Sequence, residues 1–325
     1  MIFSYKKFTL YVMIFTVTLF SLYSYIIINH KMLFMNFEYP SYLYVKEQRT
    51  KSVASPYNFI AIGDSRTQSS FMPLKFDDEN INSINFALGG SSPINGYYTI
   101  KNYLKLHKKP NYILMGYSPP IISAPFFYGP TTVKFGYLED HQYEEISSNA
   151  INLDDNKIIG SVNYYDYKIY TGMYIEDLIN GITDRRWSRN KKAWDKLQIS
   201  KGHRFAAIEP GSSELSSETH FETFVPTKIV NHYIEKILIE AKENDIQVFW
   251  FNNPINTESF DILPPQYRSE FEAYLNNLSE KFDLKVLNKP YSMESKNFGD
   301  HDHVFKGAPE VTQTIKTEFL KALDK

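Results

Sequence analysis

The chain has 325 residues, of which 43% are hydrophobic and 22% are charged, which is enough for one large or two modest domains with a packed core. Its 35 Lys and Arg against 37 Asp and Glu give a formal charge of −2, so the chain has no global basic field and we expect no nucleic-acid partner. The chain contains no cysteine, which excludes disulfides, thiolate catalysis and cysteine-ligated metal sites. Any nucleophile must therefore be an oxygen or a nitrogen.

An apolar segment without a formal charge, with His30 taken as neutral, occupies the 23 positions 8–30. As a helix it is long enough to cross a hydrocarbon core about 30 Å thick. Two lysines precede it, and the positive-inside rule keeps this short flank in the cytoplasm. The pattern predicts a cytoplasmic tail over 1–7, a transmembrane signal anchor over 8–30 and an extracytoplasmic remainder. The expected location is the cytoplasmic membrane of a bacterial cell envelope.

A cleaved signal peptide is the main alternative for this segment. Its apolar region would normally have about 7–15 residues and be followed by a small-x-small cleavage site. The stretch IIINHKMLFMN, where the apolar run ends, contains no such site. We therefore expect the anchor to be retained. The next residues, 31–57, mix aromatic and charged side chains and are interpreted as a stalk that joins the membrane to the domain.

Short apolar runs alternate with helical patterns from residue 58 onwards. The alternation predicts a parallel sheet that is covered by helices on both faces. The expected fold class is α/β: a three-layer α/β/α sandwich of flavodoxin-like type with a mostly parallel sheet of about five strands. The predicted strands are 58–62, 84–88, 112–116, 246–251 and 284–287, and the predicted helices include one that starts at Ser92-Pro93 and those at 227–245, 270–282 and 309–323.

The stretch 117–226 breaks this alternation. It is rich in Tyr and Phe, with Pro, Gly and Ser breaks and few clear periods. We interpret it as an aromatic-rich insertion within a domain that spans 58–325. Because loops at the carboxyl ends of parallel strands shape the ligand pocket, we expect this insertion to set substrate selectivity.

The first motif that can carry chemistry is Gly63-Asp64-Ser65, at the carboxyl end of the first predicted strand. A serine at a strand-to-helix turn is held rigidly, and backbone N–H groups at the helix start can stabilise an oxyanion. The alternative is a turn that only caps a helix. For Asp64 this capping role is the expected one.

The second motif is the D-x-x-H pair Asp300 and His303, just before the last predicted helix. A serine hydroxyl needs a base within hydrogen-bond reach, and that base needs a carboxylate that holds its tautomer. Ser65, His303 and Asp300 can supply all three groups. The alternatives are a solvated polar loop and a metal site that uses His301 and His303, although no further histidine pair has ligand spacing.

These two motifs, with NFALGGSSP after the second predicted strand, resemble the SGNH/GDSL hydrolase superfamily in their order along the chain. The resemblance covers the predicted domain apart from the insertion. It implies that Ser65 is the nucleophile and that Asp300 and His303 complete a catalytic triad. It also implies that Ser65 and Gly89 or Gly90 line the oxyanion hole, and that no cofactor takes part.

One departure from that family concerns the third oxyanion donor. An asparagine is expected after the third strand, but the sequence there reads MGYSPP. Ser118 or a backbone amide can take its place, or the oxyanion hole is weaker, and loss of one donor typically costs about 100-fold or more in rate. Membrane-anchored relatives that modify polysaccharides, such as the alginate O-acetylation proteins and the teichoic acid D-alanylation accessory protein, often lack a strict third block and have a similar layout.

Arg66 directly follows the predicted nucleophile. A guanidinium there can hold a phosphate or carboxylate of an anionic glycan through two parallel hydrogen bonds. An ion pair within the domain is an equally good interpretation.

A basic aromatic stretch, DRRWSRNKKAW, occupies 184–194 and contains Trp187 and Trp194. Such a stretch can rest on anionic headgroups or bind an anionic polymer. The alternative, which we favour because charge runs usually face water, is a solvated amphipathic helix.

The leading interpretation is a membrane-anchored extracytoplasmic serine esterase or O-acyltransferase that acts on cell-envelope polysaccharide through an acyl–serine intermediate. The same triad serves hydrolysis and transfer, which differ in the access of water to the intermediate. The expected partners are an envelope glycan or acyl donor, the membrane, and a membrane-bound acyltransferase. The alternative is a non-catalytic SGNH-like scaffold that binds the polymer or such an acyltransferase, and a metal-dependent hydrolase ranks last.

Overall fold

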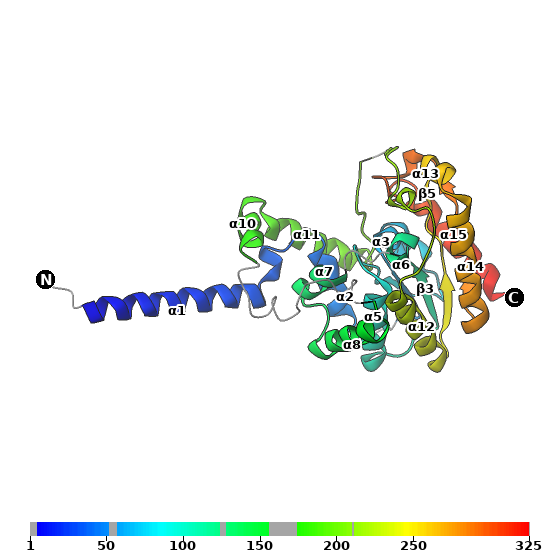
Figure 1. Cartoon of the computed structure of the whole chain (residues 1–325). Helices are drawn as coiled ribbons and strands as arrows, with labels where there is room; N and C mark the ends of the chain where they lie inside the picture. Colours follow the sequence, from blue (N-terminus) through cyan, green and yellow to red (C-terminus); the bar gives the residue numbers. More distant parts are fainter. Residues whose placement is uncertain (1–4, 52–56, 124–127, 156–173, 210, 325) are drawn as a thin grey trace.

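The computed structural model describes the chain except for residues 1–4, 52–56, 124–127, 156–173, 210 and 325. Parts of the predicted cytoplasmic tail, stalk and insertion therefore lie outside the described residues. The described part consists of an α/β domain from which one long helix, α1 (Tyr5–Asn29), projects (Figure 1).

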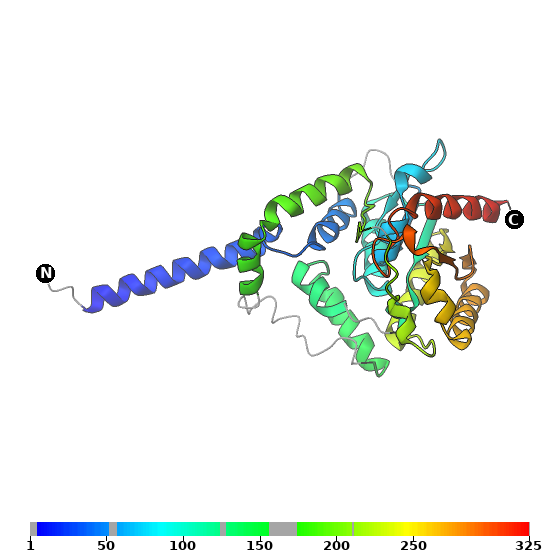
Figure 2. The same cartoon turned by 90° about the horizontal axis from the view of Figure 1, so that it is seen from above.

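The helix α1 is long and apolar enough to cross a membrane, as the sequence predicted. Its residues are apolar all round, and only Ile27, close to its carboxyl end, is buried in the protein. A helix with apolar side chains on every face is stable only where no face has to meet water, as in a bilayer. Figure 2 shows that α1 runs away from the domain along most of its length.

The core of the domain is a five-stranded sheet in the order β2-β1-β3-β4-β6, and every neighbouring pair is parallel. The order is the one found in flavodoxin-like folds. The central strands β1, β3 and β4 are short, largely apolar runs that are mostly buried, which is why the sequence shows them as continuous apolar runs, whereas the edge strand β6 is partly exposed. The strands are β2 (Ser83–Asn85), β1 (Phe59–Gly63), β3 (Tyr112–Gly116), β4 (Gln247–Trp250) and β6 (Lys285–Val286).

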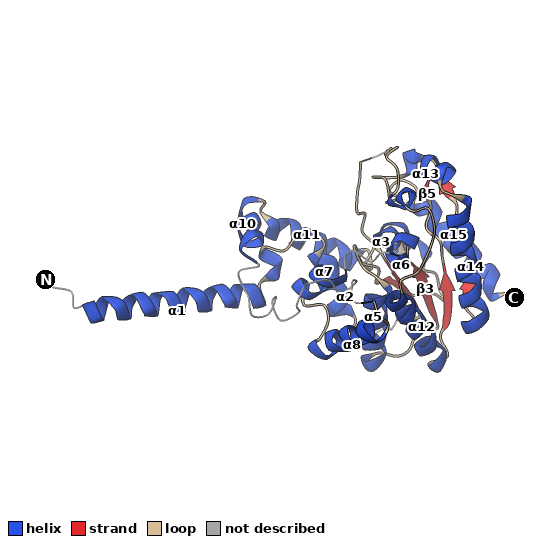
Figure 3. Ribbon diagram, viewed as in Figure 1, coloured by secondary structure: helices blue, strands red, loops and turns tan. Residues whose placement is uncertain are grey.

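Helices cover both faces of this sheet, so the predicted three-layer α/β class is confirmed (Figure 3). Ile60 and Trp250 point to the layer formed by α5, α12 and α14, whereas Phe59 and Phe249 point to the layer of α3, α4 and α15. Successive residues of a strand face opposite sides, which gives each layer its own core. The covering helices are α5 (Pro93–Leu106), α12 (Lys228–Glu243), α14 (Pro265–Phe282), α3 (Ser65–Ser70), α4 (Pro73–Phe76) and α15 (Ala308–Leu323).

The predicted stalk over 31–57 is wrong for its described residues. After the short helix η1 (Lys31–Leu33), the helix α2 (Tyr39–Gln48) packs into the domain and contributes to the main core. Its side chains Tyr42, Tyr44 and Val45 are at most 2% exposed. Aromatic residues mixed with charges look like a linker in the sequence, but here the rings bury a large apolar area against the insertion and the rest of the core.

The regular elements in the described part of 117–226 are all helices, and no strand occurs there. It runs through α6 (Pro119–Ser123), α7 (Tyr128–Phe135), α8 (Asp140–Asn152), α10 (Ile175–Thr183), α11 (Arg186–Ile199) and η4 (Ser217–His220). The helix α11 packs against α2, so the two segments form one layer beside the sheet on the α1 side of the domain (Figure 1). Two further strands, β5 (Ile255–Asn256) and β7 (Ser292–Met293), pair in parallel near α13 (Thr257–Ile262), and η5 (Ser295–Asn297) follows β7.

Candidate active site

The strand-to-helix turn after β1 places Ser65 at the first position of α3. Gly63 ends the strand where the backbone leaves no room for a side chain, since a Cβ there would lie 2.3 Å from the carbonyl oxygen of Gly116. Asp64 caps the helix, as predicted, because its carboxylate accepts the backbone N–H of Arg66 at 2.9 Å. The turn therefore directs Ser65 out of a buried strand end towards a cleft.

The structure brings Ser65, His303 and Asp300 into one hydrogen-bonded chain. His303 Nε2 lies 2.7 Å from Ser65 Oγ, and His303 Nδ1 lies 2.8 Å from Asp300 Oδ2. An ionised carboxylate can only accept, so Nδ1 carries the proton and Nε2 is free to accept the serine hydroxyl. This is the geometry that a serine nucleophile and its base require.

The loop that holds Asp300 and His303 is closed by its own backbone. Gly299 donates its N–H to the carbonyl of His303 at 2.8 Å, and Asp300 Oδ1 accepts the N–H groups of Asp302 and His303 at 2.8 and 2.7 Å. Burial acts to raise the pKa of Asp300, but the hydrogen bond and charge of His303 and these backbone donors outweigh it and hold that pKa below its ordinary value. Asp300 is therefore kept as the anion that orients His303.

A second cluster lies directly behind this triad and contains Arg66. The Arg66 side chain is 5% exposed and forms an ion pair with Glu218. Its guanidinium donates to Asp302 Oδ1 at 2.6 Å and to Ser216 Oγ at 3.0 Å. Burial acts to raise the pKa of Asp302, but Arg66 and the Ser216 hydroxyl hold it well below its ordinary value. Arg66 thus makes the intradomain ion pair, which was one of the two interpretations of its position.

Backbone N–H groups beside Ser65 are available to an oxyanion. Among the residues that the structure describes, the N–H groups of Ser65, Gly89 and Gly90 have no hydrogen-bond acceptor. Gly90 has φ +63°, a left-handed conformation that favours glycine. The positions predicted for the oxyanion hole thus line the same cleft as the serine.

Ser118 does not offer a third donor in this structure. Its N–H and its hydroxyl both point to Asp64 Oδ2, at 2.7 and 2.6 Å. Of the alternatives left open by the sequence, the replacement of the expected asparagine by Ser118 is not supported, because both of its donors are already used to hold Asp64. The same two hydrogen bonds tie the loop after β3 to the turn after β1.

The cleft in front of Ser65 has a volume of about 790 Å³. Its walls come from widely separated parts of the chain, namely the residues before α2, the turns after β1 and β2, the segment around η4, and the Asp300–His303 loop. A cleft of this size can admit a sugar unit or an acyl chain. A smaller cavity of about 30 Å³ adjoins it and shares Arg66 and Ser118.

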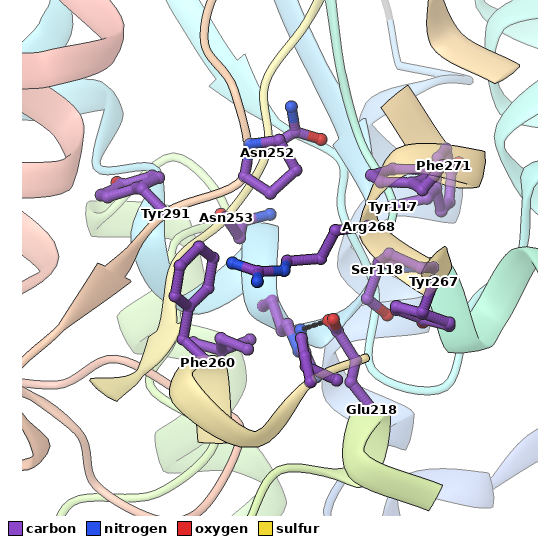
Figure 4. Close-up of a pocket in the computed structure, with 15 residues that line it drawn as sticks. Tyr117, Ser118, Glu218, Asn252, Asn253, Phe260, Tyr267, Arg268, Phe271 and Tyr291 are labelled. Carbon is purple, nitrogen blue, oxygen red and sulfur yellow. Dashed lines mark hydrogen bonds and ion pairs between the residues drawn. The ribbon is translucent and has the colours of Figure 1, made fainter. Parts of the chain in front are cut away.

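The smaller cavity is largely filled by Arg268 of α14. Figure 4 shows this side chain reaching towards Phe260 and Asn253, and its guanidinium lies 4.7 Å from the centre of the Phe260 ring. The remaining space is about that of one water molecule, so the cavity does not serve as a substrate site.

Glu38 is a residue of the cleft that the sequence analysis missed. It lies just before α2, within the segment predicted as a stalk, and its carboxylate rests so close to Gly89 that a Cβ there would be 2.2 Å from Glu38 Oε2. Burial raises the pKa of Glu38, and Arg204 and His303 only partly offset it. The available signal was a single acid within the apolar run FMNFEYP that leads into a Pro-containing helix start.

Among the described residues, no group of three or more His, Asp or Glu side chains could hold a metal ion.

No protein-family model matches the chain, and no curated protein matches it either. A solved structure from Streptococcus pneumonia, provisionally described as a platelet activating factor, aligns with a TM-score of 0.43 and 9% identity over 86% of this chain and 91% of that chain. A similarity this weak carries no argument about fold or function.

Proposed function

We propose that this chain is a membrane-anchored serine enzyme of SGNH type, an esterase or O-acyltransferase that works through an acyl–Ser65 intermediate. The single observation that carries the proposal is the hydrogen-bonded chain Ser65–His303–Asp300, which faces a cleft beside free backbone N–H groups. A solvated polar loop has no reason to align three such groups at hydrogen-bond distance across 235 residues of sequence.

In the acylation step, Ser65 Oγ attacks the ester carbonyl carbon while His303 Nε2 takes the hydroxyl proton. The oxyanion of the tetrahedral intermediate accepts from the N–H groups of Ser65 and Gly89 or Gly90. The C–O bond to the leaving alcohol then breaks, and the imidazolium of His303 returns the proton to that alcohol. Asp300 stabilises the imidazolium and holds its tautomer throughout.

In the deacylation step, water or a sugar hydroxyl attacks the acyl–Ser65 carbonyl and gives its proton to His303, and Ser65 then leaves with that proton. Water makes the protein an esterase, and a sugar hydroxyl makes it an O-acyltransferase. Lys6 and Lys7, at the amino-terminal end of α1, favour an orientation in which the domain lies on the outer face of the cytoplasmic membrane, where envelope polysaccharides are the nearest hydroxyl-rich polymers. An envelope glycan is therefore the proposed acceptor or substrate, and a membrane-bound acyltransferase is a candidate donor partner.

The second candidate is a non-catalytic scaffold, and one observation favours it. Glu38 places a carboxylate against Gly89, where an enzyme needs donors to an oxyanion. A scaffold of this kind would bind the polymer or the acyltransferase without forming a covalent intermediate.

Fluorophosphonate labelling of the full-length chain in detergent separates the two candidates. An activated serine is phosphonylated, and the label is expected on Ser65, lost in Ser65→Ala and retained in Ser217→Ala, whose serine lines the same cleft outside the triad. Thermal unfolding of each variant checks that the fold is intact. Absence of label on a folded wild-type chain would contradict the enzyme and favour the scaffold.

A further inference from the structure

The helix α10 (Ile175–Thr183) is fastened to the residues that leave the predicted membrane span. Gly181 packs so closely on this segment that a Cβ there would lie 2.7 Å from Phe34 Cα. From the start of α11, the Arg186 guanidinium donates to the Phe34 carbonyl at 2.8 Å, and Asn190 Nδ2 donates to the carbonyls of Met32 and Met35 at 3.1 and 2.9 Å. These contacts hold α10 and α11 in place relative to the end of α1.

The opposite side of α10 is apolar and uncovered. Ile175, Ile179 and Ile182 recur at i, i+4 and i+7, which places them on one face of the helix, and they are 52%, 57% and 82% exposed. Trp187, at the start of α11, is 50% exposed as well. These four side chains are called the α10 apolar face below.

The helix α10 lies next to the carboxyl end of α1 and contacts η1, which follows it. Both views place α10 beside the point where α1 meets the domain, and Figure 2 shows α10 running across the direction of α1 (Figures 1 and 2). A helix that lies across a membrane span at its end lies parallel to the membrane plane. α10 is then close to the level at which α1 leaves the acyl chains.

The residues around this face have the composition of a membrane interface. Trp is enriched at the headgroup level, where its ring is apolar and its N–H remains wet. Apart from Arg186, which is buried in contacts within the domain, α11 carries four basic side chains and a single acid, Asp195, and cations next to an apolar face favour anionic headgroups.

We propose that the α10 apolar face rests in the interface of the bilayer that α1 crosses, and so holds the domain at a set height and tilt above the lipid. The proposal rests on α1 spanning the membrane and is independent of any chemistry at Ser65. Its occupant is the lipid surface, and a second copy of the chain or a partner protein on the same face would contradict it.

Tryptophan fluorescence of the full-length chain, reconstituted in phosphatidylcholine–phosphatidylglycerol vesicles with brominated acyl chains, tests this proposal. The chain has three tryptophans, and Trp250 is a fully buried internal reference. We expect the brominated lipid to quench part of the emission and acrylamide in the aqueous phase to quench little of it. The lipid-quenched part should be lost in Trp187→Phe.

A double variant, Ile179→Glu with Ile182→Glu, should expose Trp187 to acrylamide and reduce lipid quenching at least twofold, while α1 keeps the chain in the vesicle. Ile151→Glu is the matched control, because Ile151 is 64% exposed at the end of α8, away from α1. Trp187 that is open to acrylamide and unquenched by brominated lipid in the wild type would overturn the proposal. Trp187 that is shielded from both quenchers would overturn it too, because a protein surface would then cover the face.

Discussion

Two clusters of polar side chains are built from the same two loops, and they differ in burial and in hydrogen-bond saturation. Ser65 and His303 are hydrogen-bonded to each other at the cleft, whereas their chain neighbours Arg66 and Asp302, which also line the cleft, are held in a network with Glu218 and Ser216. The guanidinium of Arg66 is 5% exposed, and the His303 side chain is 17% exposed. The inner network fastens the two loops together, and the outer chain of groups remains accessible to a substrate.

The comparison teaches that residue type alone does not separate a reactive group from a structural one. One loop contributes Ser65 to the outer cluster and Arg66 to the inner one, and the other loop contributes Asp300 and His303 to the outer cluster and Asp302 to the inner one. Neighbouring positions along the backbone therefore fall in different clusters. Variants in the outer cluster should therefore affect reactivity and leave stability unchanged, and variants in the inner cluster should do the reverse.

The largest expected effect is on reactivity, at His303. His303→Ala removes the base, and we expect the rate of fluorophosphonate labelling of Ser65 to fall by about 10⁴-fold, since a serine without its base is a poor nucleophile. The melting temperature should stay close to that of the wild type, because His303 makes its side-chain contacts at the cleft. Labelling at the wild-type rate would contradict the proposal that His303 is the base that activates Ser65.

The next effect is on stability, at Arg66. Arg66→Met leaves Asp302 and Glu218 buried without a cation, and we expect the free energy of unfolding to fall by about 3–5 kcal/mol. Urea unfolding in detergent measures it. The matched control is Arg268→Met, because Arg268 is partly exposed and makes no ion pair with a described carboxylate, so its effect should be below about 1 kcal/mol. A variant that keeps its stability but loses reactivity would instead give Arg66 a direct role at the substrate.

Two histidines, one with a carboxylate partner and one without, should contribute differently to the pH dependence of stability. His303 has a carboxylate partner, whereas His203 is buried with only the Ser69 carbonyl at 3.0 Å, and burial lowers the pKa of His203 to about 4. The ordinary pKa of histidine is about 6.5. As the pH falls from about 6.5 to about 4, His203 is therefore protonated in the unfolded chain but stays neutral in the folded chain. This contribution to stability is complete above that window and is lost on its acid side.

The loss at His203 should reach about 3 kcal/mol by pH 4, on the basis of about 1.4 kcal/mol per pKa unit. In His203→Gln, whose amide can still donate to the Ser69 carbonyl, this part of the pH dependence should be absent. Unfolding free energies of both proteins between pH 4 and 7 give the difference. Parallel pH profiles would contradict the prediction.

The smallest expected effect is on the labelling rate of Ser65 in a variant of Glu38, whose buried carboxylate lies beside Gly89. Because burial raises the pKa of Glu38, its carboxylate ionises later than usual, and each increment of negative charge beside Gly89 disfavours an oxyanion there. We expect Glu38→Gln to increase the labelling rate of Ser65 about tenfold over the wild type at high pH. The difference between the two rates should become smaller as the pH falls through the pKa of Glu38. Glu47→Gln, in the helix that follows Glu38 and outside the cleft, is the control. A slower Glu38→Gln variant would mean that the carboxylate assists His303.

Local patterns determined much of the fold. The predicted strand 112–116 coincides with β3, and the predicted helix 227–245 contains α12 (Lys228–Glu243). Such elements are readable because their apolar periodicity and their stop signals lie within a few residues of one another. The same holds for the capping role of Asp64, which depends on a neighbour two residues away.

What only the tertiary structure decided are contacts between distant segments. The aromatic residues of α2 look like a linker until distant segments pack on that helix: Phe135 and Tyr137 contact its rings, and α11, about 150 residues later, packs against it. The donors of Ser118 are used by Asp64, 54 positions earlier, and Glu38 reaches the cleft from the segment between α1 and α2. The sequence by itself determined which groups could react and which segments could form strands, because both follow from residue type and local spacing. It left open which groups are buried, paired or free, because these depend on the chain segments that the fold packs around them.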